Sequence, residues 1–253
     1  MSRQSARAIA QVSTTPLAES LSSDALMFYS GSADKAPGKG ASERITHPDA
    51  YLALAVIPHW RRTLSNFHEY PFQWHNSTWR TIEHAYQATK LLIVSSTAYH
   101  ALSVEYVAPD GANVAVEVQS MFGNEDAAMI RAMRARAVSV EDDGRTFSTY
   151  ADFEYAHVGS RTGLDARLAR KMCELTSEQI AFWGARSGRY LAEITRAKYA
   201  VCPEARAILL ATGNAQLLHR AGRSPLVRFD FLETLRSELR LLEEGNQQGV
   251  EAE

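Results

Sequence analysis

Apolar residues recur along most of this chain at spacings of three and four, the pattern of an amphipathic helix. Near the C-terminus this spacing predicts a helix that ends at Gly245 and buries four leucines, namely Leu232, Leu235, Leu239 and Leu242. Thr176 and Gln179 match a capping box and predict the start of another helix. Pro203 and Gly213 predict the beginning and the end of a third. The pattern therefore favours a mainly α protein.

A small β element is expected in the N-terminal half. Residues 71–79 predict a tight hairpin with Asn76-Ser77 as its turn, and a helix follows from Thr81, whose hydroxyl can cap the first backbone N–H groups. The central segment predicts a strand at 114–118 and a helix around 125–135. We expect a compact multihelical domain with this small β element.

Polar groups gather on one face of the helix that starts at Thr81. Glu83, Gln87 and Lys90 follow one another at i, i+4 and i+7, which stacks a carboxylate, an amide and an ammonium. Glu83 falls in the first turn, where the helix dipole favours its ionised form by roughly 0.3–1 kcal/mol. This position suits a base or an anion that faces a cationic transition state. An acid in the first turn is also ordinary helix chemistry.

The length of 253 residues and an apolar content of 45% fit one sizeable core, and no apolar run reaches the length of a membrane span. We expect a single domain over 26–245, with an insertion at about 100–170 and a flexible tail at 246–253. Residues 1–25 are rich in Ser, Ala and Thr and predict a disordered arm. We expect a cytoplasmic or nuclear location. The few basic residues of this arm also fit a weak mitochondrial targeting pattern, which is the alternative.

Charge and cysteine usage narrow the chemistry. A net charge of −2 argues against a broadly basic nucleic-acid surface, although 22 arginines against 5 lysines favour bidentate phosphate contacts. The arginine clusters at 131–136, 186–189 and 220–228 fit either such contacts or solvated helix faces. Cys173 and Cys202 lack the spacing of a disulfide framework or a metal site, so we expect a reducing compartment and no structural zinc. The sequence shows no other cluster of metal ligands, and we expect no metal and no cofactor.

Several blocks in a fixed order resemble the NADAR family of N-glycosidases and ADP-ribose-associated proteins. The resemblance covers about residues 26–94 and 172–244 and implies the same mainly α arrangement. The blocks are Phe28-Tyr29-Ser30, Leu64-Ser65-Asn66-Phe67, Trp79-x-Thr81-x-Glu83-His84-x-Tyr86-Gln87-Ala88-x-Lys90, Ala197-Lys198-Tyr199 and Leu209-Leu210-Ala211-Thr212-Gly213.

The resemblance implies that Glu83 is the catalytic residue. It implies a pocket that also contains Asn66 and a tryptophan ahead of the Lys-aromatic helix, which here is Trp183. The other candidate substrate-binding residues are Ser30, Ser65, Phe67, His84, Gln87, Lys90 and Lys198.

Three of these candidates have an ordinary structural alternative. Trp183 can stack on a base or ribose, or it can be a core aromatic. Asn66 can bind ribose hydroxyls, or it can close a turn. Lys198 can face a phosphate, or it can lie along a helix surface with its ammonium in water.

The chain departs from the family pattern before its last helix. Many members carry an acidic residue and a Trp-Gly-x-Gly loop there, whereas residues 217–230 lack this loop and Asp230 is the only nearby acid. Asp230 is therefore the candidate second acid. An arginine-bearing loop at this place is compatible with a more anionic ligand such as ADP-ribose.

The leading hypothesis is a hydrolase that removes ADP-ribose from a nucleobase, with guanine in DNA, RNA or nucleotides as the expected acceptor. Reversal of ADP-ribosylation would then be its activity, and ADP-ribosylated nucleic acid a partner. Three alternatives remain: an N-glycosidase acting on phosphorylated intermediates of riboflavin synthesis, a non-catalytic ADP-ribose or NAD-binding module, and an interaction protein built on the insertion. No membrane partner is expected.

Overall fold

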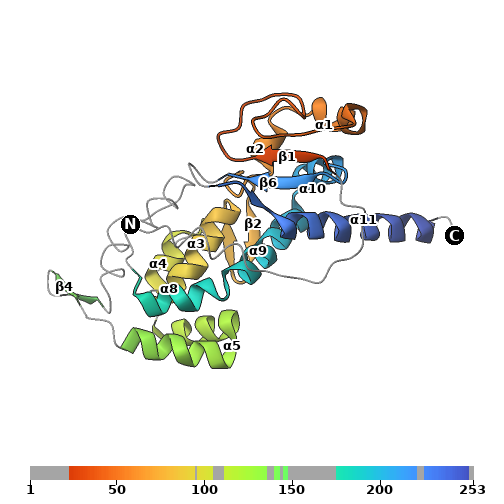
Figure 1. Ribbon diagram of the computed structural model, residues 1–253. Helices are drawn as coiled ribbons and strands as arrows, with labels where there is room; N and C mark the ends of the chain where they lie inside the picture. Colours follow the sequence, from red (N-terminus) through yellow and green to blue (C-terminus); the bar gives the residue numbers. More distant parts are fainter. Residues whose placement is uncertain are drawn as a thin grey trace. The chain divides into compact units, whose positions relative to one another are not determined.

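The computed structural model describes residues 23–94, 96–104, 111–135, 140–142, 145–147, 175–220 and 225–250. Their packing divides the chain into two units: Glu69–Lys198 belong to the first, and the described residues on either side belong to the second. Helices form most of the described structure (Figure 1), so the mainly α prediction is confirmed. The single domain over 26–245 stays a prediction. Of the predicted arm, residues 1–22 lie outside the described residues.

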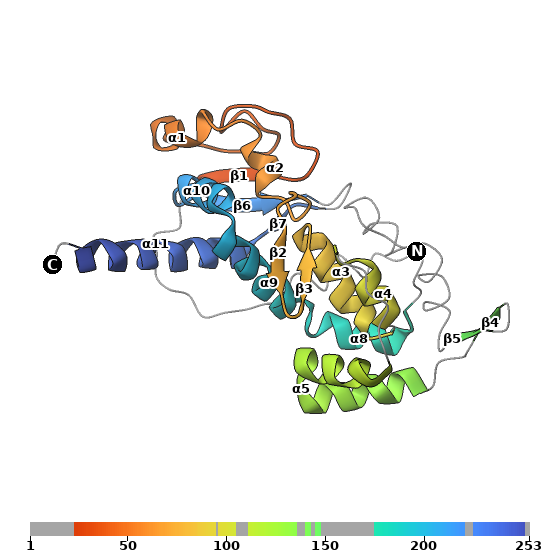
Figure 2. The ribbon, with the colours of Figure 1, turned by 180° about the vertical axis from the view of Figure 1, so that it is seen from behind.

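The first unit begins with a hairpin that leads into a buried helix. Strand β2 (Phe72–Trp74) pairs antiparallel with β3 (Ser77–Trp79), and α3 (Ile82–Leu92) and α4 (Ser96–Ala101) follow (Figure 2). Thr81 is the N-cap of α3, as its hydroxyl predicts. Most of α3 is buried, which agrees with its run of Ala and Leu residues.

The predicted turn of the hairpin is shifted by one residue. Trp74 pairs with Ser77, so the turn residues are His75 and Asn76, and His75 adopts a left-handed φ of +50°. This register also pairs Phe72 with Trp79, and it places both large aromatic side chains on the buried face. A slip by one residue would turn them toward solvent, so burial fixes the register.

Residues 114–118 lie in helix α5 (Gly111–Ala135), so the strand predicted there is wrong. Val118, Met121 and Phe122 are buried at helical spacing, whereas Val116 is exposed, so the period-two alternation does not describe the buried face. Gly123, with φ +80°, separates α5 into two helical parts, and the predicted helix around 125–135 is confirmed. The short hairpin of β4 (Val140–Asp142) and β5 (Arg145–Phe147) comes next.

Two consecutive helices follow at the end of the first unit. Helix α8 (Ser177–Gly184) starts with the predicted capping box, in which the Thr176 hydroxyl and the Gln179 side chain each bond the other's backbone N–H. Helix α9 (Ser187–Val201) belongs to the first unit as far as Lys198.

The second unit contains a three-stranded sheet. Strand β1 (Ala25–Phe28) pairs in parallel with β6 (Gln216–His219), which pairs antiparallel with β7 (Val227–Arg228). All four residues of β1 are buried, which is typical of a strand covered on both faces. The helices of this unit are η2 (Pro48–Tyr51), α1 (Leu52–Ala55), α2 (Trp60–Thr63), α10 (Pro203–Ala211) and α11 (Asp230–Val250).

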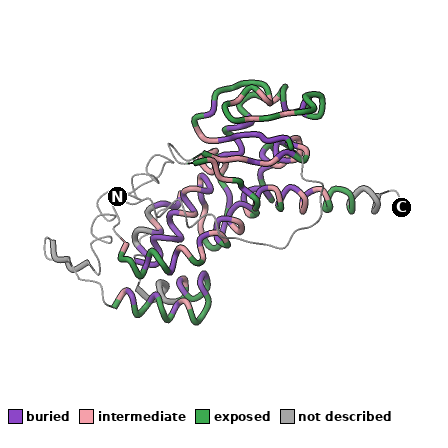
Figure 3. Tube along the Cα trace, in the orientation of Figure 1, coloured by how far each residue is buried: buried purple, intermediate pink, exposed green. Residues whose placement is uncertain are grey.

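Helix ends in the second unit test two sequence predictions. Gly213 lies just beyond α10 with φ +55°, so its predicted role at the helix end is confirmed. The predicted stop of α11 at Gly245 is wrong, because the helix continues to Val250 and Gly245 does not adopt a left-handed φ. Burial decreases along α11 (Figure 3), and Leu242 is exposed, unlike Leu232, Leu235 and Leu239.

His219 makes the stability of the second unit sensitive to acid. Its ring packs 4.6 Å from the Phe229 ring and 5.3 Å from the Phe28 ring, and burial lowers the pKa of His219 to about 4. An unfolded histidine takes up its proton near pH 6.5, so the unfolded chain binds more protons as the pH falls from about 6.5 to 4. Stability must therefore decrease across this interval.

We expect acidification from pH 7 to pH 4.5 to cost wild type about 2 kcal/mol more unfolding free energy than it costs a His219→Phe variant. Urea denaturation of both proteins at the two pH values measures the difference. Carboxylates titrate in both proteins, so their contribution to the pH dependence of stability cancels in this comparison. Equal losses would show that His219 does not cause this acid sensitivity.

Candidate functional site

The start of α3 fixes His84 in the protein interior. The Thr81 Oγ1 atom accepts a hydrogen bond from the His84 backbone N–H at 3.2 Å and lies 2.9 Å from His84 Nδ1. Neither residue is exposed. His84 therefore helps to build the helix start, whereas the sequence proposed it as a substrate-binding residue.

Glu83, Gln87 and Lys90 form one hydrogen-bonded chain along α3. Lys90 Nζ donates to Gln87 Oε1 at 2.6 Å, and Gln87 Nε2 donates to Glu83 Oε1 at 2.8 Å. The chemistry of the three groups fixes this direction. Because an ammonium can only donate, it must contact the amide oxygen of Gln87, which turns the NH₂ group toward the carboxylate.

Burial strengthens this chain of hydrogen bonds. Gln87 is 3% exposed and Lys90 9%, whereas Glu83 is half-buried. Hydrogen bonds to charged groups are stronger than neutral ones, and water screens buried groups less. The chain therefore holds the Glu83 carboxylate in one orientation, with a positive charge at the far end.

Trp183 belongs to an aromatic cluster in the first unit. Its ring stacks on Tyr190, with centroids 5.9 Å apart and planes at 9°, and it packs at a tilt against Tyr86 at 5.1 Å. Tyr190 donates to the Met121 carbonyl at 3.2 Å, and burial raises the pKa of Tyr190 to about 12. These contacts fit the core role of Trp183. Tyr86 lies three residues after Glu83, so the cluster packs on the helix that carries the carboxylate.

Lys198 is completely buried. This excludes the alternative in which its side chain lies along an exposed helix surface with the ammonium in water. The next residue, Tyr199, is buried as well, and burial raises the pKa of its phenol.

Asn66 lies in a tight turn of the second unit, directly after α2. The His68 backbone N–H donates to the Ser65 carbonyl at 3.0 Å, and the Phe67 N–H donates to Ser65 Oγ at 3.3 Å. Ser65 is buried, whereas Asn66 and Phe67 are half-buried. No hydrogen bond joins the Asn66 side chain to another described residue. The turn is thus formed by Ser65, and the amide of Asn66 is not needed to close it.

Ser30 lies in a second turn of the same unit, directly after β1. The Ser32 N–H donates to the Tyr29 carbonyl at 3.1 Å, and the Tyr29 N–H donates to Ser32 Oγ at 3.0 Å. Ser30 is half-buried within this turn.

Asp230, the candidate second acid, is the first residue of α11. Its Oδ1 atom lies 2.9 Å from Arg228 Nε, and its side chain is 63% exposed. A carboxylate at a helix start that pairs with an arginine is a common structural arrangement. The arginine-bearing loop before it, residues 221–224, lies outside the described residues.

The arginine clusters serve mainly structural contacts. Arg134 donates to the Leu92 and Ile93 carbonyls at the end of α3. Arg186 forms two hydrogen bonds with Asp126 and lies over the Phe182 ring. Arg134 and Arg186 therefore favour the structural interpretation over phosphate binding, whereas Arg131 and Arg220 are exposed.

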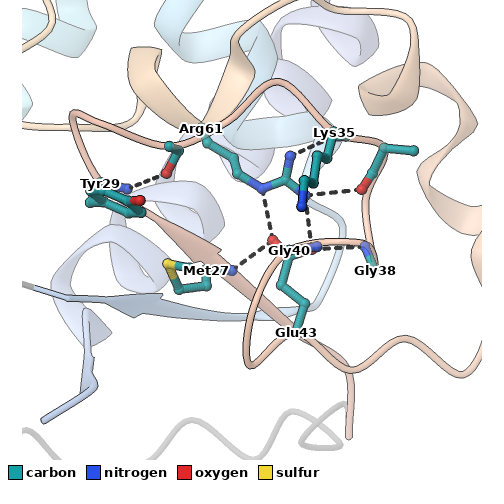
Figure 4. A network of polar contacts seen from close by, with 9 residues as sticks. Met27, Tyr29, Lys35, Gly38, Gly40, Glu43 and Arg61 are labelled. Atoms are coloured by element: carbon teal, nitrogen blue, oxygen red, sulfur yellow. Dashed lines mark hydrogen bonds and ion pairs between the residues drawn. The ribbon is translucent and has the colours of Figure 1, made fainter.

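The sequence did not predict a buried ion pair between Glu43 and Arg61. Glu43 Oε2 lies 2.8 Å from Arg61 Nη2, and the side chains are 0% and 3% exposed (Figure 4). The two residues lie 18 positions apart in the sequence, on either side of η2 and α1, so no periodicity relates them. The glycines and the isolated acid of residues 38–43 were the only available signal.

The predicted site residues fall into two groups. In the first unit the structure joins Glu83, Gln87 and Lys90, with His84 beside them in sequence. In the second unit Ser65, Asn66 and Phe67 share one turn, and Ser30 and Asp230 lie elsewhere in that unit.

The described part of the chain contains no group of three His, Cys, Asp or Glu side chains arranged to hold a metal ion. Cys202 is a buried free thiol, and Cys173 lies outside the described residues. Among the helices searched within the described ranges, none has the length and apolar character of a membrane span.

Comparisons with known proteins found one distant likeness. No family model matches the chain, and no curated protein matches it. Among solved structures, the chain is similar to the NMR structure of the E. coli protein YbiA. The match has 19% identity and a TM-score of 0.37, and it covers 74% of this chain and 81% of that chain. We draw no functional argument from a likeness at this level.

Proposed function

We propose that the protein is an N-glycosidase that hydrolyses the bond between ADP-ribose and a nucleobase, with guanine in nucleic acid or nucleotides as the expected base. The chain of Glu83, Gln87 and Lys90 on α3 is the observation that supports an enzyme. The blocks that resemble the NADAR family supply the substrate class.

Glu83 has the properties that this reaction requires. Cleavage of an N-glycosidic bond builds positive charge on the ribose carbon, and a fixed carboxylate stabilises that charge. The same group can take a proton from the attacking water while the oxygen bonds to the carbon. The bond from the ribose carbon to the base nitrogen breaks, and the proton taken from water is passed on to that nitrogen, so ADP-ribose and the free base are released.

Gln87 and Lys90 act on this chemistry through Glu83. Both were expected to bind substrate, but the hydrogen bonds described above run along the helix to the carboxylate. In the proposed enzyme they hold Glu83 in the orientation for proton transfer. Asn66 belongs to the second unit, where its turn does not use the half-buried amide, and it stays a candidate substrate-binding residue.

The direct test is to incubate wild-type protein with ADP-ribosylated guanosine nucleotide and with an ADP-ribosylated guanine oligonucleotide. We expect free ADP-ribose and the unmodified base to appear together, as measured by mass spectrometry. Binding of ADP-ribose is measured in parallel by calorimetry. Binding without release would favour the non-catalytic module. Release from a phosphorylated riboflavin-pathway intermediate alone would favour the second glycosidase activity.

A Lys90→Met variant separates positioning from substrate binding. We expect kcat to fall roughly 10- to 100-fold, because Gln87 loses the partner that directs its amide toward Glu83. The Kd for ADP-ribose is expected to remain within a few-fold. Steady-state kinetics and calorimetry give the two values.

Thr89→Val is the matched control for this variant. Thr89 is equally buried in α3, but its hydroxyl bonds the Ala85 carbonyl at 2.7 Å and takes no part in the polar chain. A large increase in Kd with an unchanged kcat for Lys90→Met would show that Lys90 contacts the ligand itself.

A further inference from the structure

The Glu43 carboxylate of the second unit is saturated with hydrogen bonds (Figure 4). One oxygen accepts from the Met27 N–H at 3.1 Å and from Arg61 Nε at 2.8 Å. The other accepts from the Gly38 and Gly40 N–H groups, both at 2.9 Å, and from Arg61 Nη2 at 2.8 Å. Glu43 therefore connects β1, the glycine-containing loop and α2.

Arg61 completes the same network from α2. Its Nη2 atom also donates to the Ala36 carbonyl at 3.0 Å, and its Nη1 atom donates to the Lys35 carbonyl. The guanidinium lies 4.1 Å from the centre of the Trp60 ring. Among the described residues, this guanidinium contacts the protein's own backbone, Glu43 and that ring.

The loop is shaped around the carboxylate. A Cβ atom at Gly40 would lie 2.6 Å from the Glu43 carboxyl carbon, and Gly38 adopts a φ of +82°. Neither position accepts a side chain without rearrangement. The conformation of the loop and the position of Glu43 are therefore fixed together.

The ion pair is connected to both turns that carry predicted ligand-binding residues. Arg62, the neighbour of Arg61 on α2, donates from Nε to the Ser32 carbonyl at 2.8 Å and so holds the turn that contains Ser30. The Arg62 carbonyl accepts from the Ser65 N–H at 3.0 Å, where the turn that contains Asn66 begins. Helix α2 has only four residues, so its placement depends on these side chains.

Stability alone does not account for the pair. Moving two charges out of water costs several kcal/mol, and apolar side chains of similar size are often as stable in their place. What an apolar pair cannot supply is the directed set of hydrogen bonds that fixes one loop conformation.

We propose that Glu43 and Arg61 are positioning residues that set the geometry of the Ser30 and Asn66 turns for recognition of an ADP-ribose-containing ligand. The identity of the ligand rests on the proposed function. The positioning of the turns rests only on the network described above.

The test uses the double variant Glu43→Leu/Arg61→Met, which removes both charges together. We expect its melting temperature to lie closer to wild type than that of Arg61→Met, in which the Glu43 charge stays buried without its cation. Hydrogen exchange at the Phe67 and His68 amides, which bond Ser65 in the turn, is expected to become at least about 10-fold faster. The Kd for ADP-ribose is expected to rise at least about 10-fold.

Arg240→Met is the matched control. Arg240 also reaches a loop of the second unit, with hydrogen bonds to the Asn214 side chain at 2.7 Å and the Gly213 carbonyl at 2.5 Å. It should leave the exchange at Phe67 and His68 and the Kd unchanged.

Each other outcome overturns a defined part of the proposal. Unchanged exchange at Phe67 and His68 would show that the pair does not position the turn. Faster exchange with an unchanged Kd would remove its role in recognition. A double variant that does not fold would make the pair a requirement for folding instead. If wild type itself fails to bind ADP-ribose, the proposed function and this ligand fail together, and exchange still reports on the turn.

Discussion

Glu83→Gln is expected to lower the rate of ADP-ribose release by roughly 10²- to 10⁴-fold, the usual contribution of a general base. Glutamine has the shape of glutamate, and its amide oxygen can still accept the hydrogen bond that Gln87 donates. It can neither take a proton from water nor oppose the positive charge on the ribose carbon. Single-turnover kinetics with mass spectrometry measure the rate, and calorimetry should show ADP-ribose binding within a few-fold of wild type.

Glu178→Gln provides a control that is matched by position. Glu178 lies in the first turn of α8, as Glu83 does in α3, so both substitutions remove a carboxylate near the positive end of a helix dipole. Only the Glu83 variant should lose activity. Equal activities of Glu83→Gln and wild type would show that another group supplies the base.

Arg61→Met is expected to lower the free energy of unfolding by about 3–5 kcal/mol, the largest stability effect among these variants. The substitution leaves the Glu43 carboxylate buried with its backbone partners but without its cation. An uncompensated buried charge is far more costly than the absence of the pair. Urea denaturation followed by circular dichroism measures the loss.

Two comparisons isolate the buried charge as the cause. Arg62→Met removes the neighbouring arginine, which is exposed and makes one hydrogen bond to the Ser32 carbonyl, so we expect a loss of about 1 kcal/mol. The double variant Glu43→Leu/Arg61→Met should recover most of the stability that Arg61→Met loses. A double variant as unstable as the single one would contradict this account.

Sequence reasoning was accurate where the interactions are local. The N-cap at Thr81 and the capping box at Thr176 join residues three positions apart, and both are present. The face that stacks Glu83, Gln87 and Lys90 follows from helix geometry alone, so it could be predicted before any packing was known.

Sequence reasoning failed where packing between distant segments determines the structure. The alternation at 114–118 fits a strand, but the segment is helical, with Val118, Met121 and Phe122 buried and Val116 exposed. The complete burial of Lys198 depends on its surroundings and not on its neighbours in the chain. Glu43 and Arg61 lie 18 residues apart in the sequence, on either side of η2 and α1, and no local pattern specifies such a contact.

The parallel pairing of β1 with β6 dictates an order of events during synthesis. Ala25 finds its partner only at Gln216, so β1 leaves the ribosome long before β6 exists. The described part of the first unit lies in one stretch, Glu69–Lys198, and can fold in the meantime. A nascent or truncated chain that ends before β6 therefore exposes an apolar strand without its partner, which is the kind of segment that chaperones bind and proteases remove.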